Sequence, residues 1–332
     1  MAVLVTGGAG YIGSHMVLEL MEHKEDVVVV DNLSTGHRHA VLCDTFYPGD
    51  IRDDLLMERV FRENDIESVI HFAADSQVAE SMRDPLKYYD NNVGGTARLL
   101  HHMVKHSVGR MVFSSTAAVY GEPDAIPITE EAPVRPQSAY GESKLSVERM
   151  LAWVSASHGI RHTCLRYFNA CGAHRDGVIG EDHRPETHLI PNLVKAAFSA
   201  SREAPVYGTD YPTPDGTCIR DYIYIGDLVK AHMLSLEKMR KENVDAVYNL
   251  GSQAGYSVLE ILRAVEGVTG IQLDIRDMDR RPGDPAVLIA SGEKARRELG
   301  FLPIKVDIGD IIETVVKFQK KHPGGYAPRE EE

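Results

Sequence analysis

The amino-acid sequence predicts an α/β fold, a doubly wound parallel sheet with a smaller C-terminal α/β lobe. In the first half of the chain, short apolar runs alternate with amphipathic helical patterns, which is the βαβ rhythm of a parallel sheet. A glycine-rich loop follows the first apolar run directly. From about residue 171 the rhythm breaks, and loops rich in Gly, Pro and charge separate short helices.

Apolar runs mark the expected core strands, and helical patterns lie between them. The strands are expected at 3–5, 27–30, 69–72, 111–114 and 162–167, and the helices at 12–23, 53–63, 92–106 and 142–157. Residues 222–250 read as a helix followed by a strand at 247–250, and we expect this segment to return to the sheet. We therefore divide the chain into a first domain at 1–170, joined by about 222–250, and a second lobe at 171–332.

The second lobe is expected to consist of loops and short helices. The loops are expected at 172–186, 203–216 and 276–285, and the helices at 187–201, 257–268 and 307–320. Residues 323–332 are expected to form a loosely held acidic tail. Loops of this kind commonly close over a ligand at the edge of a sheet, so we place substrate binding in this lobe.

The composition of the chain indicates which binding partners and which cellular compartment are expected. The net charge of −13 argues against nucleic acid as the main partner, and the apolar runs are shorter than the roughly 18 residues of a membrane helix. An apolar strand that begins near residue 2 is expected to exclude a signal peptide. The four cysteines lack metal or redox spacing, which indicates reduced thiols in a cytoplasmic protein. The histidines at 37, 39, 101 and 102 lack acidic companions at ligand spacing, so we expect surface histidines and no metal site.

The loop after the first strand predicts a dinucleotide site of the Rossmann type. Gly7, Gly10 and Gly13 permit a sharp turn, close approach of a pyrophosphate and tight packing of the next helix. Asp31 follows Gly13 by 18 residues, at the end of the second strand, where a carboxylate accepts the hydroxyls of an adenosine ribose. An ordinary glycine turn would leave Asp31 unexplained. Its charge would repel the 2′-phosphate of NADP, so NAD is the expected cofactor.

A second motif predicts acid–base chemistry at the same edge. Tyr140 and Lys144 are four residues apart, on one face of an expected helix. A cation near a phenol favours the phenolate, which then serves as a general base for an alcohol. Thr116 ends a buried strand, where its hydroxyl would share the substrate oxygen with Tyr140. The competing interpretations are an exposed helix pair for Tyr140 and Lys144, and a simple cap for Thr116.

Taken together, these motifs resemble the extended short-chain dehydrogenase/reductase family, and most closely its members that epimerise UDP-hexoses at C4. The similarity runs through nearly the whole chain, and its order and spacing are highly specific. The matching segments are TGGAGYIGSH (6–15), DNL (31–33), GDIR (49–52), HFAA (71–74), YYDNNV (88–93), FSSTAAVYG (113–121), LRYFN (165–169), GED (180–182) and DGTCIRDY (215–222).

The resemblance implies a role for each matching position. For NAD it implies the glycine loop, ribose, adenine and nicotinamide contacts, namely Gly7, Gly10, Tyr11, Ile12, Gly13, Asp31, Asn32, Asp50, Ile51, Phe72, Ala73, Ala74, Asn91, Ser114, Tyr140, Lys144 and Phe168. For the UDP-hexose it implies Thr116, Asn169, His188, Leu189, Val206, Tyr207, Arg220, Arg281, Asp284 and Leu288. Arg220 and Arg281 would bind the diphosphate of the substrate, although a solvated loop charge is the alternative for Arg281 and an ion pair with Asp221 for Arg220.

The activity implied is interconversion of UDP-glucose and UDP-galactose through transient C4 oxidation, with UDP-GlcNAc as a possible further substrate. A dehydratase of the same fold needs an acid–base pair after the strand-end Thr, where this chain has Ala117 and Ala118. Another sugar-nucleotide 4-epimerase, a keto-reductase that exchanges its cofactor and a non-catalytic NAD-binding regulator stay open as alternatives. The resemblance also implies a homodimer through helices 92–106 and 142–157, whose apolar faces would otherwise cover the sheet.

Three positions depart from the commonest pattern of the family. Ser76 stands where some members have a lysine near the cofactor, and His188 stands where many have an asparagine near the sugar. Leu288 stands where some members carry a tyrosine and others a small residue. Because this last position borders the hexose, its size is expected to limit the substituent at C2 of the sugar.

Overall fold

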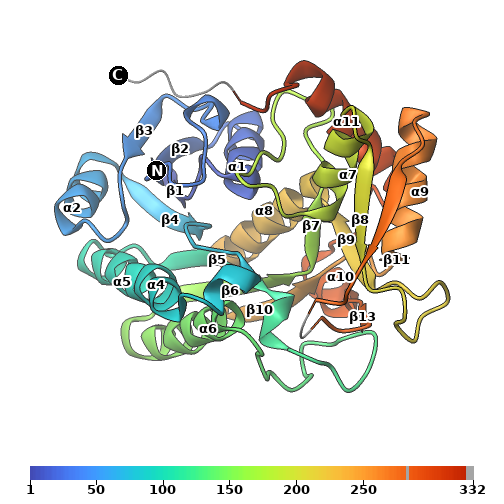
Figure 1. Ribbon diagram of the computed structural model, residues 1–332. Coiled ribbons are helices and arrows are strands. Elements are labelled where there is room, and N and C mark those ends of the chain that lie inside the picture. The colour runs from blue at the N-terminus through green and yellow to red at the C-terminus, as the bar shows by residue number, and fades with distance from the viewer. Residues whose placement is uncertain (282–283, 327–332) are drawn as a thin grey trace.

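The structure is a computed structural model that describes residues 1–281 and 284–326. Its centre is a seven-stranded parallel sheet with the order β10-β6-β5-β4-β1-β2-β3 (Figure 1). The strands are β1 Ala2–Thr6, β2 Asp26–Asp31, β3 Thr45–Pro48, β4 Ile66–His71, β5 Arg110–Thr116, β6 Arg161–Tyr167 and β10 Ala246–Leu250. The order reverses beside β1, because β2 and β3 lie on one side of it and the later strands on the other.

Helices cover both faces of this sheet, as the apolar strands require. Val3 and Val5 point to one face, which packs against α1 Tyr11–Glu22, α8 Ile225–Glu242 and α10 Glu293–Leu299. Leu4 points to the other face, which packs against α2 Asp54–Glu63, α5 Gly95–Lys105 and α6 Ala139–His158. The two-residue alternation of β1 thus feeds two separate cores.

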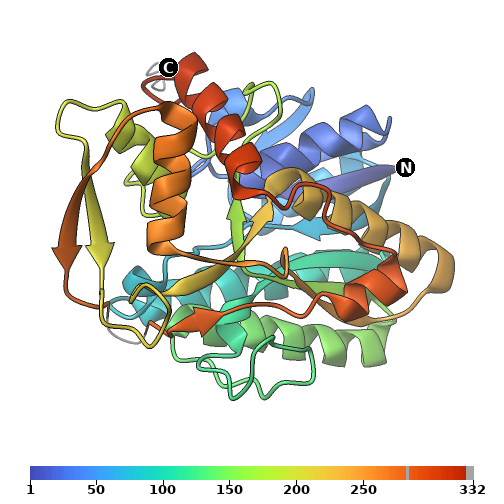
Figure 2. The ribbon, with the colours of Figure 1, turned by 90° about the vertical axis from the view of Figure 1, so that its right-hand side faces the viewer.

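The C-terminal lobe is built around three helices that contact one another: α7 Leu189–Ala197, α9 Val258–Thr269 and α11 Ile308–Lys321. A small sheet joins the lobe to the main body, with β11 Gly255–Ser257, β9 Ile219–Tyr224 and β13 Val287–Leu288 in that order and β7 Asn169–Cys171 paired with β9. Figure 2 shows β8 Glu203–Tyr207 and β12 Asp274–Met278 as a separate two-stranded ribbon at the edge of the lobe. The remaining short helical segments are η1 Arg38–Ala40, α3 Val78–Ser81, α4 Pro85–Tyr88, η2 Tyr89–Gly94 and η3 Ala117–Val119.

The predicted fold class is confirmed, and each of the five predicted core strands lies in the central sheet. β10 also lies in it, beside β6, so the segment at 246–250 does return to the sheet. The division of the chain into domains at residue 170 stays a prediction. Within the described ranges, no helix has both the length and the apolar character that crossing a membrane requires. All four cysteines are free and buried.

Three local predictions were wrong. The loops predicted at 203–216 and 276–285 overlap two strands, β8 and β12, which pair in parallel. All five residues of β12 are exposed, so no apolar pattern marks it, and backbone pairing alone identifies the strand. The tail predicted at 323–332 is anchored in its first part, since Tyr326 is buried and its hydroxyl accepts a hydrogen bond from Gly180 N at 3.0 Å. Residues 327–332 lie outside the described ranges.

Candidate active site

A cavity of about 330 Å³ opens at the carboxyl ends of the central strands, where the strand order reverses. Every residue that the sequence predicted for the dinucleotide lines this cavity: Gly7, Gly10, Tyr11, Ile12, Gly13, Asp31, Asn32, Asp50, Ile51, Phe72, Ala73, Ala74, Asn91, Ser114, Tyr140, Lys144 and Phe168. Four of the predicted substrate residues also line it, namely Thr116, Asn169, His188 and Leu189. The tertiary structure therefore brings both predicted sets to one site.

The glycine loop has the close packing that a phosphate cradle needs. Gly7 has a φ of +74°, and a Cβ there would lie 2.6 Å from Ala73 N. A Cβ on Gly13 would lie 2.1 Å from Gly7 O, so the start of α1 packs directly on the loop. At Gly10 the closest such contact is 3.4 Å, and the first turn of α1 carries no acidic side chain. The loop and the N-terminus of α1 therefore fit a dinucleotide pyrophosphate.

Asp31 is fixed at the end of β2 by backbone donors. Its Oδ2 accepts from Ala9 N at 2.9 Å, and its Oδ1 accepts from Leu33 N at 2.7 Å. Burial raises the pKa of Asp31, and these two hydrogen bonds oppose that rise. The carboxylate thus holds the glycine loop against β2, a role that the sequence pattern did not reveal, and each oxygen keeps a second lone pair for a ribose hydroxyl.

Asp50, predicted to contact the adenine, belongs to a hydrogen-bonded group in the part of the cavity next to Asp31. Its carboxylate accepts from Arg52 Nη2 at 2.7 Å and from Asn32 Nδ2 at 3.1 Å. The hydrogen bond from Arg52 lowers the pKa of Asp50 to about 2, so the carboxylate is charged at neutral pH. This arrangement fixes Asn32 beside Asp31.

Tyr140 and Lys144 lie in the first turns of α6, which begins at an N-cap whose Ser138 hydroxyl accepts from Gly141 N at 3.1 Å. Burial raises the pKa of the Tyr140 phenol, and a hydrogen bond with Thr116 opposes the rise. Burial lowers the pKa of Lys144 to about 7, against the opposite effect of Glu148. Lys144 Nζ donates to Ser114 O at 2.8 Å, at the end of β5. The lysine thus ties α6 to β5.

A buried network behind these residues was missed by the sequence analysis. Arg166 on β6 donates through Nε to Glu148 Oε1 at 2.9 Å and through Nη1 to Tyr120 at 2.9 Å. Ser115 on β5 donates to the same Glu148 oxygen at 2.5 Å. The network joins β5, β6 and α6 directly beside Thr116 and Lys144. Its only signal in the sequence is the spacing of four residues between Lys144 and Glu148.

The other predicted substrate residues lie outside the cavity lining, in the C-terminal lobe: Val206, Tyr207, Arg220, Arg281, Asp284 and Leu288. The guanidinium of Arg281 lies over the Tyr207 ring, 4.3 Å from its centre. Arg220 forms an ion pair with Asp284 and donates to Pro285 O at 2.7 Å. Tyr207 lies on β8 and Arg220 lies on β9, so two different strands hold these two groups.

The alternative for Arg220 can be decided, and the surroundings of Val206 and Leu288 can be described. The ion pair that the sequence suggested between Arg220 and Asp221 is wrong, because Asp221 accepts from Ser252 N at 2.7 Å and Ala290 N at 3.0 Å while Arg220 pairs with Asp284. The Val206 side chain is buried in the core of the lobe, and its backbone pairs with that of Asp277 on β12. Leu288 lies opposite Arg220 in the β13–β9 register, and both Leu288 and Phe168 pack against the apolar cluster that contains Val119, Tyr120, Ile128 and Leu145.

The expectation of surface histidines was wrong for His102. It is buried and gathers with His106 and Glu58 between α2 and α5. A second group, made of Glu181, His183, Glu186 and His188, lies at the wall of the cavity. Both groups come together through tertiary or loop geometry, which the histidine spacing considered in the sequence did not reveal.

Comparisons with known proteins agree with this site. A model of the NAD dependent epimerase/dehydratase family matches residues 3–251. The UDP-glucose 4-epimerase of Halalkalibacterium halodurans is 50% identical over 327 residues, which cover 98% of each chain. A crystal structure of a UDP-glucose 4-epimerase superposes with a TM-score of 0.97 at 48% identity, covering 99% of this chain and 100% of the other. The enzyme from Bifidobacterium longum, solved with NAD+ and UDP, superposes with a TM-score of 0.93 at 43% identity over 98% and 100% of the two chains.

These matches extend over nearly the full length of both partners, and the glycine loop and the Tyr140–Lys144 pair lie in the cavity that the fold places at its switch point. The chain therefore belongs to the NAD-dependent epimerase/dehydratase family and, within it, to the UDP-glucose 4-epimerases.

Proposed function

We propose that this protein is an isomerase that interconverts UDP-glucose and UDP-galactose, with NAD as its resident cofactor. The observation that carries the proposal is the meeting of Tyr140, Lys144 and Thr116 with the glycine loop in one cavity. The family is NAD-dependent, and the Bifidobacterium longum relative was solved with NAD+ and UDP. Because epimerisation is redox-neutral overall, a cofactor that stays bound suffices for repeated turnover.

The residues of this chain fit NAD along the whole cavity. Gly7, Gly10 and Gly13 would hold the pyrophosphate, Asp31 the adenosine ribose and Phe168 the nicotinamide side. The carboxylate of Asp31 disfavours the extra phosphate of NADP. When bound, NAD supplies the hydride acceptor and donor for C4 of the hexose.

Tyr140 would move the proton of the C4 hydroxyl. Its phenolate takes the proton while C4 is oxidised to the ketone. The phenol returns the proton after the keto sugar has rotated to present its opposite face. Burial raises the pKa of Tyr140, so the phenolate needs a positive charge nearby, which an oxidised nicotinamide and a protonated Lys144 would provide. Thr116 would hydrogen-bond the same oxygen, and Lys144 would keep α6 in place through Ser114.

The diphosphate of UDP would be held in the C-terminal lobe. Arg220 and Arg281 are candidates to face it, and a protein of net charge −13 needs such local cations to bind a dianion. Arg220 would exchange part of its ion pair with Asp284 for the phosphate, leaving Asp284 to the uridine side. If the protein recognises its substrate mainly through UDP, the hexose stays free to rotate. Epimerisation requires this rotation, because hydride must be delivered to either face of C4. We extend the proposal to N-acetylated UDP-hexoses, with Leu288 as the residue that limits them.

The decisive experiment is NMR of UDP-galactose incubated with the purified protein and no added cofactor. Appearance of UDP-glucose, with bound NAD released on denaturation, supports the proposal. A 4-keto-6-deoxy product would instead identify a dehydratase, which Ala117 and Ala118 argue against. An unchanged spectrum across a panel of UDP-sugars would contradict catalysis and favour a binding protein.

We also propose that the protein is cytoplasmic, which its four free cysteines support.

We further propose a homodimer through α5 and α6. Support comes from Trp153 on α6, a large apolar residue that is 78% exposed. Analytical ultracentrifugation of Trp153→Asp should then show monomers. The matched control is Leu55→Asp, at an 85% exposed leucine on α2, which should stay dimeric. A monomeric unmodified protein would overturn the dimer.

A further inference from the structure

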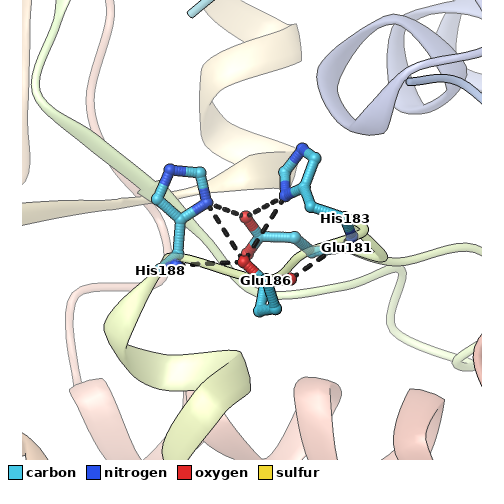
Figure 3. A group of neighbouring side chains, drawn as sticks. All are labelled: Glu181, His183, Glu186 and His188. Atoms are coloured by element: carbon cyan, nitrogen blue, oxygen red, sulfur yellow. Dashed lines mark hydrogen bonds and ion pairs between the residues drawn. The ribbon is translucent and has the colours of Figure 1, made fainter. Parts of the chain in front are cut away.

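Four side chains with metal-ligand chemistry converge in the loop between β7 and α7. Glu181, His183, Glu186 and His188 come from eight consecutive residues, and Figure 3 shows both imidazoles and both carboxylates turned toward a common point. Three of them, Glu181, His183 and His188, also line the cavity. The proposed reaction uses none of the four as an acid or a base.

Three of the distances within this group are close to those between the ligands of a tetrahedral metal ion, and the fourth, between His188 and Glu181, is shorter. His183 Nδ1 lies 3.3 Å from Glu181 Oε1 and 3.5 Å from Glu186 Oε1. His188 Nδ1 lies 3.6 Å from Glu186 Oε1 and contacts Glu181 Oε1 directly. Bonds of 2.0–2.1 Å from one tetrahedral ion to nitrogen and oxygen separate its ligands by about 3.3 Å. All four ligand atoms lie within 4.8 Å of one another.

Burial and charge favour a cation at this point. The carboxylates of Glu181 and Glu186 are only 4% and 5% exposed, and two buried negative charges require compensation, to which the ammonium of Lys195 contributes from 3.9 Å away from Glu186 Oε2. Glu186 is oriented by backbone donors, since its Oε1 accepts from Thr187 N at 2.9 Å and from His188 N at 3.0 Å. Such support of a ligating carboxylate is typical of metal sites.

The state of His183 is an independent sign. Its Nδ1 is buried, and in the described part of the chain it finds no partner with hydrogen-bond geometry, although two carboxylate oxygens lie near it. The nitrogen thus lies near both carboxylates without a hydrogen bond of good geometry to either, a position that suits a bond to an ion between them.

We propose that Glu181, His183, Glu186 and His188 bind one Zn²⁺ ion. Two imidazole nitrogens with two carboxylate oxygens in a tetrahedron suit zinc, whereas Mg²⁺ and Ca²⁺ require six or more oxygen ligands. With four protein ligands the site is structural. It fixes the loop to the start of α7, where Leu189, Ile190 and Pro191 form part of the cavity wall.

The other His and Glu group provides the matched control. Glu58, His102 and His106 offer three ligand atoms, but Lys105 Nζ already lies 2.9 Å from Glu58 Oε2. His106→Ala therefore removes a histidine from a similar cluster without touching the proposed site.

The test measures zinc rather than turnover, so it is separate from the proposed function. Elemental analysis of the protein purified without chelators should find one zinc per chain, and zinc added after chelator treatment should raise the melting temperature. His183→Ala and Glu186→Gln should each weaken zinc binding, measured by competition with a chromophoric chelator, by more than the roughly 10- to 100-fold that loss of a supporting residue costs.

His106→Ala should retain the zinc of the unmodified protein. Circular dichroism and bound NAD are measured for each variant, and Glu186→Gln keeps the shape of the side chain should His183→Ala fail to fold. Absence of tight zinc binding, or zinc retained in both His183→Ala and Glu186→Gln, would overturn the proposal. Loss of zinc in His106→Ala alone would place the ion at the other cluster and overturn it equally.

Discussion

Among single residues, Tyr140 is the group on which the proposed chemistry depends. Its phenol lies in the cavity, and its pKa is raised by burial. The hydrogen bond of Lys144 goes to Ser114 O, so the first role of the lysine is to brace the helix that carries Tyr140. The sequence pattern predicts only that the lysine charge lies near the phenol. The structure adds that a hydrogen bond from Lys144 connects their helix to β5.

Replacing Tyr140 by Phe should lower kcat by about 10²- to 10⁴-fold, the range of a general acid–base group, because no phenol remains to carry the proton. UDP binding should be nearly unchanged, since the hydroxyl acts on the hexose. Steady-state kinetics and calorimetric titration with UDP measure the two effects. Tyr47→Phe, which removes a hydroxyl bonded to Glu63 far from the reacting centre, is the control. Turnover of Tyr140→Phe within a few fold of the unmodified protein would disprove the role.

Leu288 bears on the size of the sugar that the protein accepts. It packs against the same apolar cluster as Phe168, and Phe168 lines the cavity. Leu288→Gly should therefore increase kcat/KM for UDP-GlcNAc relative to UDP-galactose, because it opens space near C2 of the hexose. Leu288→Tyr should do the reverse. An unaltered ratio of the two substrates in both variants, measured by coupled assay or NMR, would remove Leu288 from the specificity site.

At the scale of elements, the junction of β1, the glycine loop and α1 has the least tolerance for added atoms. Gly13 packs on the carbonyl of Gly7, and Gly7 packs on the end of β4. The close contacts leave room for a ligand only on the outer side of the loop, near Gly10. The junction thus combines strand, turn and helix into one binding element.

Gly13→Ala should lose bound NAD and lower the melting temperature, because its Cβ would lie 2.1 Å from Gly7 O. Gly267→Ala tests a glycine that has room for a side chain. Gly267 lies inside α9, and no atom of another part of the structure lies within 4 Å of the new Cβ. That substitution should stabilise the protein by up to about 1 kcal/mol through helix propensity. Chromatography of the nucleotide released on denaturation and calorimetric melting measure both. Retention of stoichiometric NAD in Gly13→Ala would contradict the packing argument.

At the scale of the whole molecule, buried neutral histidines link stability to pH. His15, His71 and His232 are buried, and burial lowers their pKa to about 4, 3 and 4 respectively. The unfolded chain keeps an imidazole pKa of about 6.5. Between these values the unfolded state binds more protons, so stability rises with pH and falls as the solution is acidified below about pH 6.5.

His232→Leu should make this acid dependence shallower. Each such histidine adds at most about 1.4 kcal/mol per pH unit to the slope, and the variant removes one of them. Urea unfolding at several values between pH 7 and pH 5 gives the slope directly, whatever the substitution does to stability at neutral pH. His101→Ala, at an exposed histidine, should keep the slope of the unmodified protein. Equal slopes in His232→Leu and the unmodified protein would show that His232 is not buried neutral.

The sequence alone determined the parallel sheet and predicted the NAD residues and the Tyr140–Lys144 pair, because each is encoded in local periodicity or fixed spacing. Buried parallel strands are apolar throughout, and the loop from Gly7 to Gly13 has backbone requirements that only glycine meets. The predicted NAD residues therefore line one cavity, even though Gly7 and Phe168 are far apart in the chain.

Tertiary structure decided what local pattern cannot encode. The pairing of exposed β12 with β8, the partner of Arg220, the brace formed by Arg166 and Glu148, and the buried state of His102 all depend on contacts between distant segments. Such contacts form because burying a charge or a backbone polar group without a partner costs free energy. The partner is the suitable group that the fold places nearest. Spacing within the sequence identifies the reactive groups, and packing decides what surrounds them.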